Sequence, residues 1–230
     1  MHEGFVLHRW DFQESSIIID VFTRLQGRVR IVAKGAKRNN SPWRAILQPF
    51  IPLLLDWRGR GDLKTLISAE TQTGLATPAL TGTALYSAFY LNELLTRLLP
   101  PQGEAEPLYE EYAKTLELLH HSSEVEPLLR HFEWRLLWHL GVAFDWQVDA
   151  ATGEALGQSE FCYFVAGQGF FNAQQSSEKA IKLASKDVQQ LAQFERLDSR
   201  LLKLLKHIMR AELAIHLGEK PLHSRQLFRS

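Results

Sequence analysis

The chain has 230 residues, 45% hydrophobic side chains and a formal net charge of zero, which predicts one large or two small globular domains with a real core. Its single cysteine excludes an intramolecular disulfide and a zinc site built from several cysteines, and favours a reducing compartment such as the cytosol. The sequence shows no apolar run long enough for a membrane span and no signal-peptide pattern at its start.

The zero net charge conceals a basic, acidic, basic layout along the chain. Residues 1–78 hold 11 Lys/Arg and 7 Asp/Glu, a net charge of +4. Residues 79–178 hold 4 and 14, a net charge of −10, and residues 179–230 hold 11 and 5, a net charge of +6. This layout indicates that the two ends act together on an anion. The sequence leaves open whether they share a face.

Residues 5–75 have the pattern of a small β domain, with short apolar runs separated by turn residues. The candidate strands are residues 5–9, 16–23, 28–33, 46–57 and 64–69. Five short strands predict a small barrel or a sandwich, and a five-stranded oligonucleotide-binding (OB) barrel is the commonest solution at this length. Pro49 and Pro52 inside the fourth candidate strand favour an edge, a bulge or a bend there.

The third candidate strand and the loop behind it are strongly cationic. Residues 27–44 hold six basic side chains and no carboxylate: Arg28, Arg30, Lys34, Lys37, Arg38 and Arg44. A strand face of arginines that ends in a Lys/Arg loop suits the backbone of a polyanion such as DNA. An equally good interpretation is a solvated edge strand that its charges keep soluble.

Thr77 and Pro78 mark a boundary, after which the pattern predicts a mainly helical domain over residues 79–230. Helices are expected at residues 84–99, from 107, at 127–140, at 186–194 and at 199–217. Residues 144–176 read as an irregular insert, with two short strands at 161–165 and 169–171. The predicted fold class is therefore α+β, with an OB-fold domain at residues 1–78 followed by the helical domain.

Two of the expected helices carry candidate binding residues. The last long helix presents Arg200, Lys203, Lys206 and Arg210 away from its apolar side. These side chains predict a second strip of phosphate contacts, although an ordinary amphipathic surface helix has the same pattern.

The helix at residues 127–140 places Arg130, Trp134 and Leu137 on one line and ends near Leu140. Arginine and tryptophan on one helical line are typical of an interface anchor. An isolated cation in an acidic segment suits an acidic peptide that ends in a carboxylate. A large core with a snorkelling arginine is the alternative.

The chemistry of a catalytic or metal site is not recognisable in the sequence. There is no Gly-x-Ser-x-Gly elbow, no helical zinc pair and no phosphate-binding glycine loop. We therefore predict no catalytic residue, no metal and no cofactor. Asp62 and Lys64 faintly resemble one end of some nuclease sites, which leaves a magnesium-dependent nuclease as one alternative. A pure protein-interaction adaptor is the other.

Several long segments, in order along nearly the whole chain, resemble the bacterial RecO family of DNA repair proteins. They are GRVRIVAKGAKR, LQPFIPLLLDWRGRGDLKTLISAE, LYSAFYLNELLTRLLP, LLRHFEWRLLWHLG and LGEKPLHSR. The resemblance implies an OB barrel followed by a helical domain, and a recombination mediator that binds single- and double-stranded DNA and anneals complementary strands. It also implies two partners, RecR and the single-stranded DNA-binding protein, with which the family loads the RecA recombinase at the nucleoid.

The resemblance adds two expectations about the helical domain. Many family members carry a four-cysteine zinc motif where this chain has residues 148–154, so the chain resembles the zinc-free branch. Packing of Phe161, Tyr163, Phe170 and Phe171 is expected to hold this region instead. The acidic, Phe-ending tail of the single-stranded DNA-binding protein is expected to dock on the helical domain at Arg130, Trp134, Leu137 and Leu140.

Overall fold

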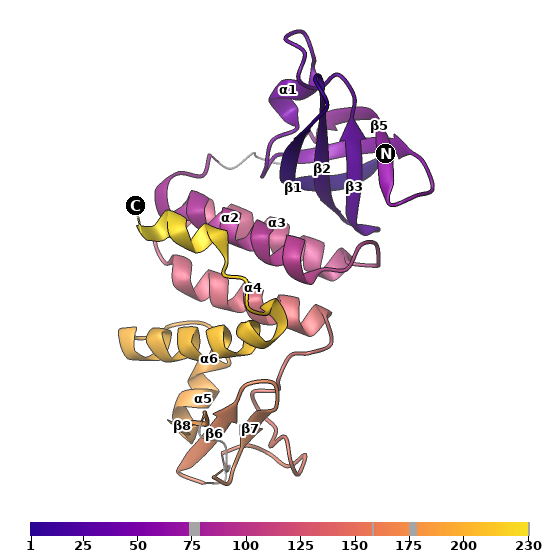
Figure 1. Ribbon diagram of the computed structural model, residues 1–230. Coiled ribbons are helices and arrows are strands. Elements are labelled where there is room, and N and C mark those ends of the chain that lie inside the picture. Colours follow the sequence, from indigo (N-terminus) through magenta and orange to yellow (C-terminus); the bar gives the residue numbers. More distant parts are fainter. Residues whose placement is uncertain (74–78, 158, 175–178, 230) are drawn as a thin grey trace. The chain divides into compact units, whose positions relative to one another are not determined.

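The computed structural model describes residues 1–73, 79–157, 159–174 and 179–229 (Figure 1). They form two compact units, one of Met1–Ser123 with the C-terminal residues from Leu222, the other of Glu124–Pro221. The predicted domain boundary at Thr77 and Pro78 lies outside the described residues. Among the helices that the structure describes, none combines the length and the apolar character that crossing a membrane requires.

The first unit is built on a closed five-stranded barrel. Its strands are β1 (His2–Phe12), β2 (Ser16–Thr23), β3 (Gly27–Ala33), β4 (Pro52–Arg58) and β5 (Leu63–Thr71). The strand order is β1-β2-β3-β5-β4, with β3 and β5 parallel and the other neighbouring pairs antiparallel. The interior holds apolar side chains from all five strands, among them Val6, Ile19, Val21, Ile31, Leu53, Leu55 and Leu66. The predicted OB-type barrel is confirmed.

Strand β3 lies within the barrel wall, because it is hydrogen-bonded to β2 on one side and to β5 on the other. The interpretation of this segment as an edge strand is therefore wrong. Its side chains alternate as expected: Val29 and Ile31 are buried in the core, whereas Arg28 and Arg30 are on the other face. The turn before β3 needs Gly27, because φ is +60° there and a Cβ atom would lie 2.7 Å from the carbonyl oxygen of Gly103.

The fourth strand is shorter than predicted. Residues Trp43–Ile46 form a short helix, α1, and β4 begins only at Pro52. The residues between them cannot continue a strand, since Pro49 lacks an N–H and Phe50 has a φ of +69°. The predicted bend at the prolines is confirmed, and the predicted strand over residues 46–51 is wrong.

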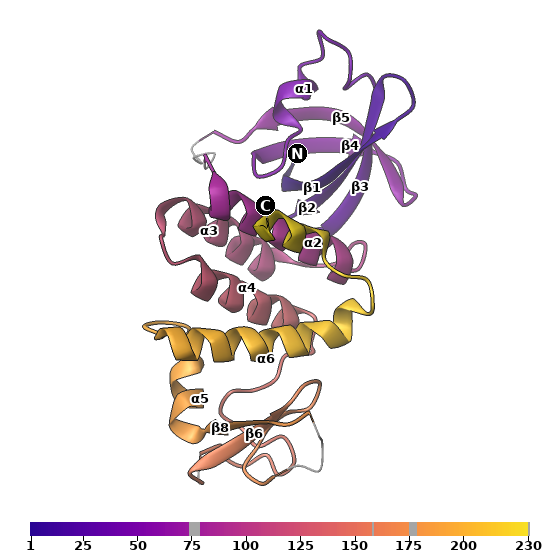
Figure 2. The same cartoon turned by 60° about the vertical axis from the view of Figure 1, so that its left-hand side comes forward.

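Helices α2 (Gly82–Leu98) and α3 (Glu106–His121) lie beside the barrel in the same unit (Figures 1 and 2). The amide of Asn92 donates to the carbonyl of Leu7 at 2.9 Å, and Tyr112 Oη donates to Asn92 Oδ1 at 2.5 Å. A buried polar chain thus fixes both helices against β1. The C-terminal 3-10 helix η1 (His223–Arg229) runs along α2, where Glu93 accepts hydrogen bonds from the backbone of His223 and from Ser224.

The second unit combines helices with a small antiparallel sheet. The helices are α4 (Val125–His139), α5 (Ser185–Leu191) and α6 (Ser199–Leu217). The sheet has the order β7-β6-β8, from β6 (Phe161–Val165), β7 (Gly169–Phe171) and β8 (Ile181–Ala184). The two predicted strands and the last long helix are confirmed, and β8 was not predicted. Asp198 caps the N-terminus of α6, because its carboxylate accepts from the N–H of Leu201 at 2.7 Å.

The segment at residues 148–154 is held by a carboxylate. Asp149 is 4% exposed and accepts hydrogen bonds from the N–H groups of Ala151, Thr152 and Asn172, at 2.8, 3.2 and 2.6 Å. The bond from Asn172, strengthened by the other two, holds the pKa of Asp149 below its ordinary value. The structure shows no group of three or more His, Cys, Asp or Glu side chains that could hold a metal ion, within the residues that it describes.

Aromatic packing supports the same region, through two of the expected side chains and through others that were not predicted. Phe144 packs on Trp146, Phe164 and Phe170, with ring centroids 4.7, 5.0 and 5.5 Å away. Phe170 and Phe171 are buried, as expected. Phe161 is 36% exposed, so its expected role in the core is wrong.

Candidate nucleic-acid interface

Arg28 and Arg30 on the outer face of β3 converge on one buried carboxylate. The register of β2 and β3 pairs Asp20 with Arg30. Asp20 Oδ1 accepts from Arg30 Nε at 2.8 Å, and Asp20 Oδ2 accepts from Arg30 Nη2 and from Arg28 Nη1, each at 3.2 Å. The hydrogen bond to Asp20 raises the pKa of Arg30 above its ordinary value. One buried acid thus fixes two of the predicted DNA contacts.

The two arginines differ in how much of their charge they present. The side chain of Arg28 is 14% exposed and also donates to the carbonyl of Leu99 at 3.1 Å, so it ties β3 to the end of α2. The side chain of Arg30 is 49% exposed. Both line a hollow of about 520 Å³ that Asp62 and Gln102 also line. Of this pair, Arg30 is the better placed to meet a ligand.

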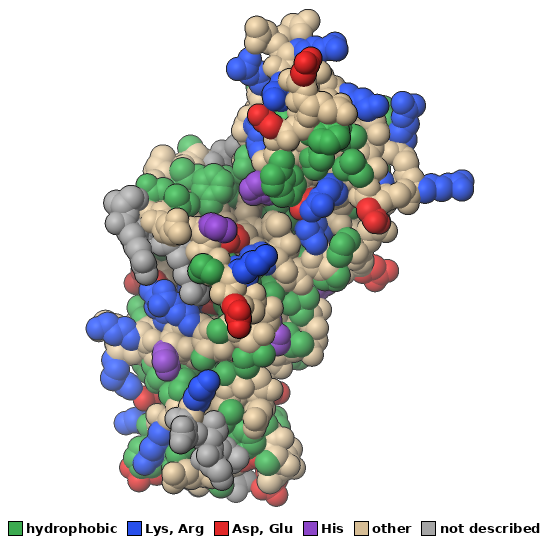
Figure 3. Space-filling model, in the orientation of Figure 1, with side chains coloured by type: hydrophobic (Ala, Val, Ile, Leu, Met, Phe, Trp, Pro, Cys, Tyr) green, Lys and Arg blue, Asp and Glu red, His purple; other side chains and the backbone are tan. Residues whose placement is uncertain are grey.

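The loop after β3, taken here to include the short helix α1, is a compact series of turns that displays cations. Its backbone is fixed by hydrogen bonds from Lys37 N to Ser15 O at 2.9 Å and from Arg38 N to Gly35 O at 3.1 Å. Lys34, Arg38 and Arg44 are exposed. Lys37 is partly buried and pairs with Asp11 at 3.2 Å. Three of the four predicted loop cations therefore face solvent, and in the space-filling view Lys and Arg side chains project around the barrel (Figure 3).

The β4–β5 loop adds two cations that we did not predict as contacts. Arg58 and Arg60 are exposed. Because β5 pairs with β3 at Leu63 and Arg30, this loop ends beside Arg30. OB barrels commonly bind oligonucleotides on this wall and with this loop. The signal was present in the sequence as Arg-Gly-Arg-Gly, but its proximity to β3 depends on a long-range parallel pairing.

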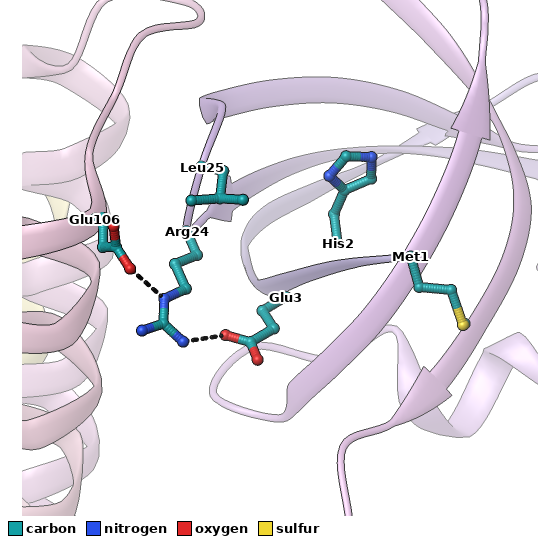
Figure 4. Close-up of a pocket in the computed structure, with 6 residues that line it drawn as sticks. All are labelled: Met1, His2, Glu3, Arg24, Leu25 and Glu106. Carbon is teal, nitrogen blue, oxygen red and sulfur yellow. Dashed lines mark hydrogen bonds and ion pairs between the residues drawn. The ribbon is translucent and has the colours of Figure 1, made fainter.

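A further arginine of the barrel, Arg24, forms ion pairs that join the barrel to α3. Arg24, in the β2–β3 turn, donates to Glu3 on β1 at 3.0 Å and to Glu106 on α3 at 2.9 Å (Figure 4). It also pairs with Glu110 at 2.7 Å. These acids raise the pKa of Arg24. The acidic start of α3 therefore binds the barrel through Arg24. The adjoining hollow of about 330 Å³ is lined by Glu3, Arg24 and Glu106, whose charges already pair with one another.

Two of the four predicted cations of α6 form ion pairs, although the side chain of Arg200 is still 60% exposed. Arg200 forms a two-bond ion pair with Asp187 on α5, at 2.7 and 2.9 Å, and this pair lowers the pKa of Asp187. Lys206 pairs with Glu126 on α4. Lys203 and Arg210 are exposed on the remaining face of the helix. Two of the four predicted phosphate contacts on α6 therefore also serve as ion pairs within the second unit.

The predicted site for a partner's tail lies mostly in the core of the second unit. Arg130 is 4% exposed, and its Nη2 lies 3.0 Å from Oε1 of Glu133, which is 0% exposed. Leu137 is fully buried and Leu140 is half-buried. Trp134 Nε1 donates to the carbonyl of Phe144 at 3.3 Å. The sequence carried a signal for this burial, namely a glutamate one helical turn after the arginine. Tail binding at these residues stays a prediction.

The residues of the nuclease alternative differ in accessibility. Asp62 is exposed in the β4–β5 loop, whereas Lys64 is only 9% exposed on β5. The two side chains therefore do not form a joint exposed site.

Known proteins share both the sequence and its two-part layout. The family models "Recombination protein O N terminal" and "Recombination protein O C terminal" match residues 1–74 and 79–226. A DNA repair protein RecO from Idiomarina loihiensis is 53% identical over 225 residues, which cover 97% of this chain and 95% of that protein. Proteins of the same name from Actinobacillus pleuropneumoniae serotype 5b and Nitrosospira multiformis are each 41% identical, covering 100% and 98% of this chain and 94% and 93% of theirs. These names describe repair proteins and state no enzymatic reaction. The chain therefore belongs to the RecO family of DNA repair proteins.

Proposed function

We propose that the chain is a recombination mediator that binds single- and double-stranded DNA without base specificity and anneals complementary strands. The observation that carries this proposal is the loop after β3, which displays Lys34, Arg38 and Arg44 on a closed OB barrel. Cations on such a loop neutralise phosphates and release counterions, and these contacts are blind to sequence. Arg30 and the exposed arginines of the β4–β5 loop extend the same cationic wall.

Annealing follows from the same chemistry. Two complementary strands repel each other through their phosphates, and a protein that neutralises both brings their bases together. Exposed Lys203 and Arg210 on α6 supply a second group of cations for this purpose. We further propose that the protein acts in the cytosol with RecR and with the tail of the single-stranded DNA-binding protein, to load RecA on coated DNA.

Labelled complementary oligonucleotides, mixed with the protein and magnesium, separate this proposal from its alternatives. The mediator accelerates the appearance of duplex and leaves both strands at full length. Shortened strands would instead favour a magnesium-dependent nuclease. A protein adaptor would neither anneal the strands nor show any DNA affinity that falls with added salt.

A further inference from the structure

A tryptophan on the outer wall of the barrel is not explained by packing alone. Trp10 lies near the end of β1 and is 37% exposed. On this wall Trp10 pairs with Ile18, and His8 pairs with Asp20, which in turn pairs with Arg30. A single exposed apolar side chain is ordinary. What distinguishes Trp10 is the arrangement of its neighbours.

Two side chains hold the indole ring in place. The ring of His8 lies 4.3 Å from it, tilted by 43°. The guanidinium carbon of Arg30 lies 5.3 Å from the ring centroid, within the range of a cation–π contact. Arg30 is itself held by Asp20 through Nε and Nη2, so these two bonds do not use its Nη1. The wall therefore holds the guanidinium of Arg30 over the indole ring of Trp10 through contacts within the protein.

A hollow opens on the side of Trp10 toward α2 and η1. Its volume is about 750 Å³, and its lining includes the rings of Trp10 and Phe89 and the polar side chains of Arg9, Gln48 and Thr96. All of these residues belong to the first compact unit. Aromatic faces, cations and scattered hydrogen-bonding groups together match a splayed nucleobase, since its faces are apolar and its edges are polar.

We propose that Trp10 is a stacking platform for an unpaired base of single-stranded DNA, with Arg30 on the neighbouring phosphate. This inference rests on the proposed function, because it assumes that the barrel wall binds DNA. The positive charge of the wall complements the phosphates. Duplex DNA keeps its base faces within the stack and offers only base edges and phosphates. Trp10 therefore adds a preference for single strands over duplex, which the loop cations alone cannot supply.

The test compares Trp10→Leu, Trp10→Phe and the control Trp138→Leu, in which the lost tryptophan is 57% exposed on α4. Binding of a labelled oligothymidylate and of a labelled duplex is measured by fluorescence anisotropy at several salt concentrations. Loss of one stacked base weakens oligothymidylate binding roughly 5- to 100-fold in Trp10→Leu. Because Trp10 carries no charge, the slope of log affinity against log salt stays unchanged. The affinities of Trp10→Phe and Trp138→Leu for oligothymidylate stay within about threefold of the wild-type value.

Three results overturn the inference. Equal oligothymidylate binding by Trp10→Leu and wild type shows that an apolar side chain suffices and favours a peptide as occupant of the hollow. An equal loss of oligothymidylate and duplex binding assigns Trp10 a structural role. Absence of DNA binding by the wild-type protein removes the proposed function as well, and this outcome is distinct from the other two.

Discussion

The carboxylate of Asp20, 1% exposed, accepts hydrogen bonds of 2.8 and 3.2 Å from the guanidinium of Arg30, which is 49% exposed. One end of this pair is buried in the barrel wall and the other faces solvent. Because Asp20 also accepts from Arg28, a single acid orients both arginines of β3. The two arginines of β3 are thus positioned by a buried acid on the same face of the barrel.

Replacing Asp20 with asparagine is expected to lower the free energy of unfolding by about 1–3 kcal/mol, because the hydrogen bonds to both arginines lose their charged acceptor. Urea denaturation measures this change. The control is Asp11→Asn, which removes an exposed partner of Lys37 and should change stability by no more than about 0.5 kcal/mol. Equal stability of Asp20→Asn and wild type would show that the pair has no orienting role.

Much of the barrel was predictable from the sequence, because its strands alternate with period two and are bounded by turn residues. The exception at residues 46–51 arose where Pro49 and the positive φ of Phe50 replace a strand. The site was less predictable. The basic residues could be counted, but their partners come from strand register and helix packing. An acid within the apolar run of β2 was the one local signal of a buried ion pair at Asp20.

The buried ion pair of Arg130 and Glu133 should have a large effect on the free energy of unfolding. Arg130→Ala removes a cation 3.0 Å from a carboxylate that is 0% exposed, and it should lower the free energy of unfolding by about 3–5 kcal/mol. The double variant Arg130→Met with Glu133→Gln removes both charges and should recover most of that loss. Thermal and urea denaturation of the two variants check this, and an unchanged stability of Arg130→Ala would contradict it.

The same double variant gives the cleaner test of tail docking. A labelled acidic, Phe-ending peptide should bind it roughly tenfold more weakly than wild type if Arg130 contacts the terminal carboxylate. Equal binding in a stably folded double variant would place the tail elsewhere.

The contribution of Asp149 to the stability of the fold should be lost in acid. Its pKa is lower in the folded chain than its ordinary value of 3.8, because the backbone N–H groups of Asn172, Ala151 and Thr152 favour the charged form. The contribution is therefore fully present above about pH 4 and is lost as the pH falls through the lower, folded value. The stability difference between wild type and Asp149→Asn should shrink between pH 6 and about pH 3, as followed by urea denaturation. A pH-independent difference would contradict this assignment.

On α6, the exposed cations can be separated from the paired ones. The variant Lys203→Glu with Arg210→Glu should slow strand annealing while its circular dichroism and melting temperature match those of wild type. Arg200→Glu serves as a contrast, because it breaks the ion pair with Asp187 and should lower the melting temperature. Normal annealing by the double variant would make this stripe an ordinary amphipathic surface.

The salt dependence of DNA affinity tests most directly whether the loop after β3 binds phosphates. The variant Lys34→Ala, Arg38→Ala, Arg44→Ala is compared with wild type and with the control Lys182→Ala, Lys186→Ala, Lys220→Ala, which removes as many cations from the second unit. Fluorescence anisotropy at a series of salt concentrations gives the slope of log affinity against log salt. We expect the slope of the loop variant to fall by about 0.7 to 0.9 for each phosphate contact removed, on any DNA sequence, while the control keeps the wild-type slope. An identical slope in the loop variant and wild type would show that the loop after β3 makes no phosphate contacts.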